Sequence, residues 1–280
     1  MKASLVLEGG TFRSLYTAGV LDRLLEREWM FPYIVGVSAG ALSACSYVSR
    51  QPERTLRVFR NYRNDPRYMG VRHFFTERSY FGIDFAYREI PNVLDPFDWE
   101  TFRAFPGTLE FGVTNATTGA VEFVDGLTMN ESCDWLQATC AIPLVFPERT
   151  IHGGVYYDGG LADSVPIERA KEKGFAKHVI VLTRPKGYRK ETDLSNKVAS
   201  FVLRSKYPRI AERLDTRAAT YNATMDAIDR MERDGEAFVF RPSHALSSFE
   251  SDTTQMLRNY KLGLRHADAR LDEMEQWLQS

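Results

Sequence analysis

A short motif around Ser38 contains the residue types that an activated serine needs. Gly36, Ser38 and Gly40 form the pattern G-x-S-x-G, with apolar residues 33–35 before it and the small-residue run 39–44 after it. This order predicts a strand, a sharp turn and a helix, as in a nucleophile elbow. The N–H groups and the dipole of such a helix favour the oxyanion formed when a serine attacks an ester. The alternative is a nucleotide-binding turn in which the serine only caps the helix.

A glycine-rich segment near the N-terminus offers backbone donors. Residues 8–14 have the sequence EGGTFRS and follow the apolar run 3–7, which we predict to be a buried strand. The carboxyl ends of parallel strands meet at one edge of a sheet, so we expect this turn and Ser38 to lie at the same site. The alternative is a dinucleotide-binding loop, although the second glycine of G-x-G-x-x-G is missing and no ribose-binding acid is evident.

A third segment contributes a carboxylate. Asp158, Gly159 and Gly160 follow a short predicted strand at 155–157. An aspartate with its ordinary pKa of about 3.9 is a weak base at neutral pH. A direct hydrogen bond in a partly desolvated cleft can nevertheless orient and activate a serine. The alternative is a turn aspartate that bonds its own backbone.

Strand and helix patterns alternate along most of the chain. The first 50 residues predict a strand at 3–7, an amphipathic helix at 15–28, a strand at 33–35 and the helix after Ser38. Further strands are expected at 109–115, 120–124, 155–157, 177–182 and 237–240, and helices at 131–139 and 165–173. This order is typical of an α/β protein with a mainly parallel central sheet.

Two parts of the chain elaborate this core of about 3–182. Residues 52–105 mix basic and aromatic side chains and are expected to form a helical insertion that covers the site or packs on the sheet. Residues 194–280 are expected to contain long helices at 208–233 and 251–279. The basic loop 184–190 could meet a lipid headgroup or be solvated. We interpret residues 1–280 as a single domain, because no repeat, linker or break in composition divides them.

Composition narrows the classes of partner. The 280 residues are 44% hydrophobic and 26% charged, and the net charge of −1 provides no overall basic field for nucleic acid. Cys45, Cys133 and Cys140 have neither the number nor the spacing of a disulfide framework or a zinc site. The N-terminal apolar run is too short for a secretory signal, and no stretch approaches the roughly 18 apolar residues of a transmembrane helix. We therefore expect a cytoplasmic protein.

The joint order of the three segments resembles the patatin-like phospholipase family. In that family a glycine-rich oxyanion loop comes first, a G-x-S-x-G serine second, and an Asp-Gly-Gly or Asp-Gly-Ala aspartate third. The similarity covers roughly residues 5–170, and the sequence YDGGLADSVPI at 157–167 also matches the family's usual continuation. The resemblance implies a three-layer α/β/α fold.

The resemblance also implies a role for each segment. Ser38 would be the nucleophile and Asp158 the base of a Ser-Asp dyad that forms an acyl-serine intermediate. The oxyanion loop would consist of Gly9, Gly10, Thr11 and Arg13. The motif glycines would be Gly36, Gly40, Gly159 and Gly160. Arg13 would anchor the loop or contact a phosphate headgroup, and no metal or organic cofactor would be needed.

The first segment departs from the family's usual Asp-Gly-Gly-Gly-x-Arg-Gly. Glu8 replaces the leading aspartate, and Thr11 and Ser14 replace two of the glycines. A threonine at position 11 would be strained if that residue needs a positive φ. We expect these departures to change the catalytic efficiency or the range of substrates more than the type of reaction.

Three functions therefore remain open from the sequence. The first is a serine acyl-ester hydrolase of the lipid acyl hydrolase type, acting on a lipid or small acyl ester with peripheral membrane contact. The second is a Ser-His-Asp esterase, for which His244 is the best candidate, while His178 and His266 are eligible by chain order. The third is a catalytically idle lipid- or partner-binding protein of the same fold. We expect the first.

Overall fold

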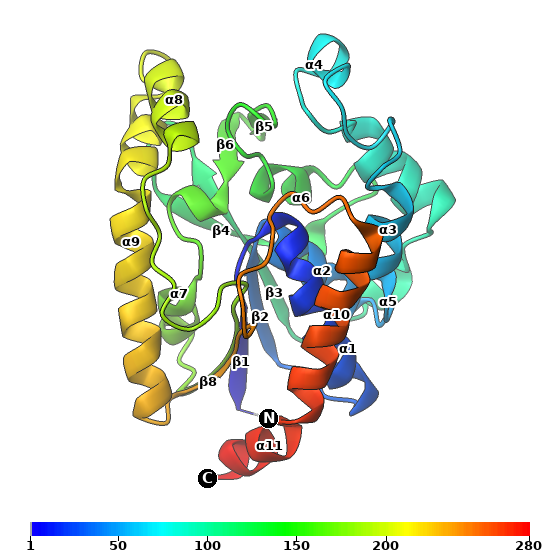
Figure 1. The fold of residues 1–280 in the computed structure, drawn as a ribbon, viewed down its shortest axis with the longest axis vertical. Coiled ribbons are helices and arrows are strands. Elements are labelled where there is room, and N and C mark those ends of the chain that lie inside the picture. Colours follow the sequence, from blue (N-terminus) through cyan, green and yellow to red (C-terminus); the bar gives the residue numbers. More distant parts are fainter. Residues whose placement is uncertain (1) are drawn as a thin grey trace.

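A single mixed sheet runs through the molecule, with helices on both faces (Figure 1). The computed structural model describes residues 2–280. Its strands are β1 (Ala3–Leu7), β2 (Tyr33–Val37), β3 (Thr108–Asn115), β4 (Val121–Asp125), β5 (Arg149–Ile151), β6 (Gly154–Asp158), β7 (Lys177–Val181) and β8 (Ala237–Phe240). They lie in the order β5-β6-β3-β2-β1-β7-β8, and β4 pairs with β3 off this path. The predicted three-layer α/β/α fold is confirmed.

The helices form two layers. They are α1 (Ser14–Glu26), α2 (Ala39–Val48), α3 (Arg54–Tyr62), α4 (His73–Thr76), a π-helix (Phe85–Leu94), α5 (Trp99–Arg103), α6 (Asp134–Thr139), α7 (Ile167–Glu172), α8 (Leu194–Leu203), α9 (Pro208–Arg233), α10 (Thr253–Asp268) and α11 (Leu271–Gln279). In Figure 1, α7 and α9 lie on one side of the sheet, and α1, α2 and α10 lie on the other. Among residues 2–280, no helix combines the length and the hydropathy needed to cross a bilayer.

The central strands are apolar because both of their faces are covered. Side chains alternate between the faces of a strand, so Leu5 and Leu7 of β1 join the core under α1 and α2. Val6, between them, joins the opposite core with Ile180 of β7 and Ile228 of α9. Strands buried on both faces are typical of parallel sheets covered by helices. Accordingly, β1, β2, β3, β7 and β8 are parallel, whereas β4, β5 and β6 run antiparallel to their neighbours.

Three elements differ from the sequence-based expectation. The segment 251–279 forms two helices, because the backbone leaves the helical conformation at Arg270 (φ −129°). The helix α8 was not predicted, although Asp193 caps it by accepting a hydrogen bond from the N–H of Asn196 (2.8 Å). The strand β5 was not predicted either, because its three residues are too short to show a period.

The insertion at 52–105 folds as α3, α4, the π-helix and α5. Aromatic residues of this segment, including Phe59, Tyr68 and Phe85, share a core cluster with Phe12 and with Tyr260 of α10. The insertion therefore packs against the α1–α10 layer. Several of the same side chains also line a pocket described below.

Helices α1 and α10 approach each other through glycines. A Cβ at Gly263 of α10 would lie 2.1 Å from the carbonyl oxygen of Tyr16, and a Cβ at Gly19 of α1 would lie 2.2 Å from that of Tyr260. Both distances are shorter than a carbon–oxygen contact can be, and the neighbouring atoms belong to helix backbones that cannot easily move. The close packing of this layer depends on the absence of both side chains.

We predict that Gly263→Ala destabilises the protein. Alanine normally favours a helix over glycine by about 1 kcal/mol, but here overpacking should outweigh that gain and lower the free energy of unfolding by about 1–3 kcal/mol. Urea denaturation measures the difference. The matched control is Gly70→Ala, because apart from its chain neighbours no heavy atom of the described residues lies within 4 Å of a Cβ at position 70. Equal stability of the two variants would contradict the packing argument.

Candidate active site

Ser38 lies on the turn between β2 and α2, as the sequence predicts. Its backbone has φ 55° and ψ −128°, a strained conformation for a residue other than glycine. A Cβ at Gly40 would lie 2.6 Å from the carbonyl oxygen of Leu7, so the following helix can approach β1 only with glycine at that position. Gly36 lies within β2 and pairs with Leu7. The segment therefore has the geometry of a nucleophile elbow.

The pairing of three strands brings Asp158 to the level of Ser38. Val37, just before the serine, pairs with Gly112 of β3. The next residue of β3, Val113, pairs with Asp158 on the antiparallel strand β6. Since β3 lies between β2 and β6, Ser38 and Asp158 reach the same level of the sheet from opposite strand directions.

The Ser38 hydroxyl lies close enough to the Asp158 carboxylate to lower its pKa, and both residues line one pocket. Both residues are buried, with 6% and 3% of their surfaces exposed. Burial raises the pKa of Asp158, and the hydrogen bond from Ser38 and the positive charge of Arg217 oppose that shift. The N–H of Gly160 also donates to Asp158 Oδ1 (2.8 Å), and Gly159 and Gly160 form the turn after β6. Asp158 thus bonds the backbone of its own turn, as expected of a turn aspartate, and it also interacts with the serine.

Thr139, at the end of α6, fixes the elbow and was not identified from the sequence. Its Oγ1 accepts a hydrogen bond from the N–H of Ser38 (2.8 Å) and donates to the carbonyl oxygen of Gly112 (2.6 Å). The residue is fully buried. One hydroxyl therefore joins the turn of Ser38 to the strand that also pairs with Asp158. A lone threonine at a helix end gives no sequence signal for this role.

The predicted oxyanion loop lies beside Ser38. Gly9 lies so close that a Cβ there would be 3.1 Å from the Cβ of Ser38. In the described part of the chain, the N–H groups of Gly10 and Thr11 donate to no other protein group. Gly9, Gly10, Thr11, Arg13 and Ser38 line the same pocket. Two backbone donors without a protein partner therefore belong to residues that line the same pocket as Ser38.

Thr11 has the positive φ (48°) for which the sequence predicts strain. Its hydroxyl is placed to donate to the carbonyl oxygens of Ser248 (2.6 Å) and Gly10 (2.7 Å). Ser14, the other departure from glycine, donates to the carbonyl oxygen of Thr11 (2.7 Å). Both substituted residues therefore form hydrogen bonds that a glycine could not form, and these hold the loop in its strained conformation.

Glu8 and Arg13 attach the loop to the rest of the fold. Glu8 accepts hydrogen bonds from the N–H of Thr183 (2.5 Å) and from the hydroxyl of Tyr221 (3.0 Å). Arg13 donates to Thr183 Oγ1 (3.3 Å) and to Ser248 Oγ. Burial lowers the pKa of Arg13 to about 10, and the group remains cationic at neutral pH. These contacts fit the anchoring role expected of Arg13.

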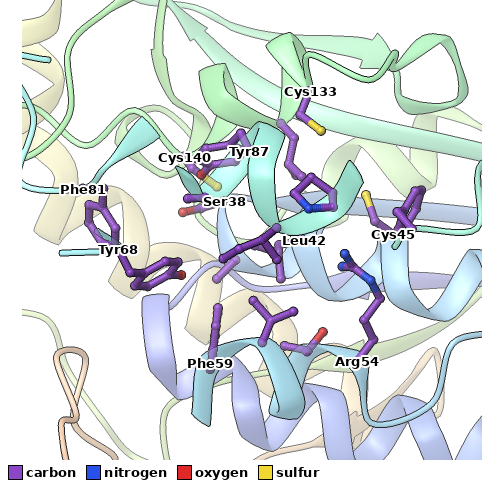
Figure 2. A pocket seen from close by; sticks show the side chains of 18 of the residues that line it. Ser38, Leu42, Cys45, Arg54, Phe59, Tyr68, Phe81, Tyr87, Cys133 and Cys140 are labelled. Carbon is purple, nitrogen blue, oxygen red and sulfur yellow. The ribbon is translucent and has the colours of Figure 1, made fainter. Parts of the chain in front are cut away.

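An apolar pocket opens from Ser38 toward the insertion (Figure 2). The space between its lining residues is about 1010 Å³ when the open solvent at its mouth is included. Figure 2 shows Ser38 next to Cys140 and Tyr87 on one side of the pocket. Cys45 and Arg54 lie on the opposite side of the pocket. The apolar walls include Leu42, Val58, Phe59, Tyr68, Ile90 and Phe146. Residues 52–105 therefore line the pocket, and the same segment packs on α1 and α10.

A second, polar pocket adjoins the first at Ser38. The space between its lining residues is about 1260 Å³ when the open solvent at its mouth is included. Ser38, Thr11 and Ile142 line both pockets. Its charged lining residues are Glu8, Arg13, Asp158, Arg184, Lys190, Asp193 and Arg217. The serine hydroxyl therefore lies at a boundary between an apolar compartment and a charged one.

The histidines lie away from this boundary, and none of the five lines either pocket. His178 is buried in β7 and bonds Ser4 through Nδ1 (2.8 Å). His266 contacts the hydroxyl of Tyr16 (3.1 Å), and His244 is exposed beside Ser243 (3.3 Å). The histidine that a Ser-His-Asp arrangement requires is therefore not brought to Ser38 in this structure.

One solved structure and one curated protein are similar to this chain. A solved structure, VipD from Legionella pneumophila, superposes with a TM-score of 0.50 and 15% sequence identity, covering 97% of this chain and 67% of VipD, which is a likeness of fold. The uncharacterised Escherichia coli (strain K12) protein YjjU is 25% identical over 190 residues, 66% of this chain. The chain spans about half the length of that relative, since 52% of YjjU is covered.

Two family models match successive parts of the chain. Residues 207–279, which contain α9 to α11, match a domain of unknown function (DUF6363). Residues 5–171 match the patatin-like phospholipase family, and they contain the elbow at Ser38, the glycine-rich loop and Asp158. The chain therefore belongs to the patatin-like phospholipase family.

Proposed function

We propose that this protein is a serine acyl-ester hydrolase that cleaves lipid acyl esters with a Ser38–Asp158 dyad. The observation that carries the proposal is the interaction of the Ser38 hydroxyl with the buried Asp158 carboxylate, where the polar pocket adjoins the apolar pocket. Membership of the patatin-like phospholipase family supports a lipid hydrolase in general terms. The apolar pocket suits the acyl chain of such a substrate.

The first half of the proposed reaction forms an acyl-enzyme. The oxygen of Ser38 attacks the acyl carbon while its proton passes to Asp158, which gives a tetrahedral intermediate. The N–H groups of Gly10 and Thr11 and the N-terminus of α2 stabilise the oxyanion. The bond to the alcohol then breaks, the alcohol leaves with the proton from Asp158, and the acyl group stays on Ser38.

The second half repeats these steps with water. Asp158 takes a proton from water as the water oxygen attacks the acyl carbon, and the bond to Ser38 breaks. The serine recovers its proton from Asp158, and a fatty acid leaves. Both halves use only groups of this chain together with substrate and water.

We predict that Ser38→Ala and Asp158→Asn each lower kcat/KM for an ester by at least about 1,000-fold, because the two groups act as one unit. His244→Ala should keep nearly full activity, which separates the dyad from a triad. Rates are measured on a panel of glycerides, phospholipids and short esters, with circular dichroism to verify folding. A fluorophosphonate probe should label the wild type but not Ser38→Ala, and equal labelling of both would favour an idle binding protein.

The pH profile tests the role of Asp158 as base. The aspartate must be ionised, and burial raises its pKa, so kcat/KM should be lost as pH falls through a value above the ordinary ~3.9 of aspartate. The charge of Arg217 lowers the pKa of Asp158. Arg217→Gln should therefore move the acid limb for a neutral ester to higher pH, whereas Arg209→Gln, an exposed cation paired with Glu212, should leave it in place. If Arg217→Gln leaves the acid limb of the pH profile in place, the result would argue against Asp158 as the base.

We also propose peripheral contact with a lipid surface at the end of the molecule where α4 and α8 lie (Figure 1). Two groups of apolar side chains are exposed there. The most exposed members are Phe75 near the end of α4 (91% exposed) and Phe201 on α8 (82% exposed). The exposed cations Arg72 and Lys197 lie beside them. The carboxyl ends of β1 and β2, which lead into the loops of the site, point to the same end. Apolar anchors flanked by cations suit an anionic bilayer.

We expect Phe75→Asp and Phe201→Asp to weaken binding to vesicles of mixed phosphatidylcholine and phosphatidylglycerol about tenfold or more. Burial of one such ring contributes about 1.5–3 kcal/mol, and 1.4 kcal/mol corresponds to tenfold. Sedimentation with vesicles measures the binding. Gln276→Asp adds the same charge at α11, at the other end of the molecule, and should bind like the wild type. If all three variants bind equally, the proposed surface is wrong.

A further inference from the structure

Three cations of the polar pocket have no carboxylate partner in the described part of the chain. Arg217 donates to the carbonyl oxygen of Gly160 (2.8 Å) and shows no further partner for its two terminal nitrogens. Arg184 lies over the ring of Tyr188 (4.4 Å), and Lys190 lies over that of Tyr221 (4.9 Å). We call Arg184, Lys190 and Arg217 the cationic cluster.

Neighbouring cations of the same loop do find acidic partners. Lys186 pairs with Glu232 (3.4 Å), and Arg189 pairs with Asp226. These pairs lie outside the polar pocket, whose lining includes neither of the two cations. The missing ion pairs are therefore a feature of the cations that line the pocket and not of the loop as a whole.

The carboxylates of the pocket are occupied by other groups. Glu8 accepts from Thr183 and Tyr221, and Asp158 accepts from Gly160 and interacts with Ser38. Asp193 caps α8. Among the described residues, none of these carboxylates forms an ion pair with the cationic cluster, although the charges of Arg217 and Lys190 act on Asp158 and Asp193 from a greater distance. With Arg13, the cations that line the pocket outnumber its carboxylates.

Like charges close together repel one another in this pocket. Burial, and then the charge of Arg217, lower the pKa of Lys190 to about 7. The charge of Glu8 opposes this shift, and the charges of Arg13 and Arg184 add to it. A bound anion would reverse these effects, because it would neutralise the cluster and favour the charged form of Lys190. The pocket therefore favours an anionic ligand.

The position of Ser38 decides which part of a substrate meets the cluster. The serine lies where the two pockets join, so an ester with its acyl chain in the apolar pocket must direct its alcohol portion into the polar pocket. This step rests on the proposed function. We propose that the cationic cluster binds a phosphate group on the leaving alcohol, and that the preferred acyl donors are lipids with a phosphomonoester.

The chemistry of the cluster favours phosphate, and a dianion in particular. The planar guanidinium groups of Arg184 and Arg217 can each donate two parallel hydrogen bonds to phosphate oxygens. Lys190 adds a point charge to the same pocket. Three unpaired cations are matched better by the two charges of a phosphomonoester than by the single charge of a phosphodiester, and a neutral glyceride would leave all of them unpaired.

The test compares two esters with the same acyl chain, a 1-acyl-glycerol 3-phosphate and the corresponding monoacylglycerol, presented in the same neutral micelles. For the wild type, kcat/KM should be at least about tenfold higher for the phosphate ester. Lys190→Met and Arg184→Met should each lower that ratio about tenfold. Lys186→Met, which removes a cation of the same loop that lies outside the pocket, should leave the ratio unchanged. Equal ratios in wild type and all variants would overturn the proposal.

A binding measurement separates this proposal from the catalytic one. Glycerol 3-phosphate and inorganic phosphate are titrated into wild type and Lys190→Met by calorimetry, which requires no turnover. Binding of glycerol 3-phosphate that is lost in Lys190→Met supports the assignment even if no ester is hydrolysed. Lysine-dependent binding of phosphate with no effect on the ester ratio would mean a site for free phosphate, and would overturn the leaving-group role. Hydrolysis of the neutral ester by the wild type tests the proposed function alone.

Discussion

The pairing of β3 between β2 and β6 is the constraint on which the candidate site depends. Gly112 fixes the level of Val37 on one side, and Val113 fixes the level of Asp158 on the other. A one-residue slip in either pairing would turn the alternating side chains to the other face of the sheet. Thr139 strengthens the same connection, because its hydroxyl bonds both the N–H of Ser38 and the carbonyl oxygen of Gly112. The backbone register of the sheet places the serine and the carboxylate at the same height along the strands. Their short side chains can therefore reach each other.

The state of Asp158 follows from opposing effects at this meeting point. Burial disfavours its charged form, while the hydrogen bonds from Ser38 and Gly160 and the charge of Arg217 favour it. Burial is the largest of these effects, so the pKa of Asp158 is raised. A raised pKa makes an aspartate a stronger base, which is the property that a dyad without histidine requires. Arg217, on α9, thus connects the part of the chain outside the patatin-like match with the chemistry proposed inside it.

The site also joins two kinds of surface. The insertion supplies half of the residues that line the apolar pocket on one side of Ser38. The loop after β7 and α9 supply the cationic cluster on the other side. An amphipathic ester has the same division, with an apolar acyl chain on one side of the carbonyl and a polar alcohol on the other. The complementary division of the pocket is the physical reason why we propose a lipid, rather than a small ester, as the substrate.

The sequence by itself determined the local parts of this protein. The G-x-S-x-G pattern between an apolar run and a small-residue run predicted the elbow at Ser38, and the alternation of periods predicted the α/β layers, because turns, strands and helices depend on neighbouring residues. The strain at Thr11 was also foreseeable. Only the tertiary structure decided what depends on contacts between distant residues. It joined Thr139 to Ser38, left Arg184, Lys190 and Arg217 without ion-pair partners, and kept the histidines away from the serine. A lone threonine, arginine or histidine has no period or motif, so its role appears only when the fold brings its partners to it.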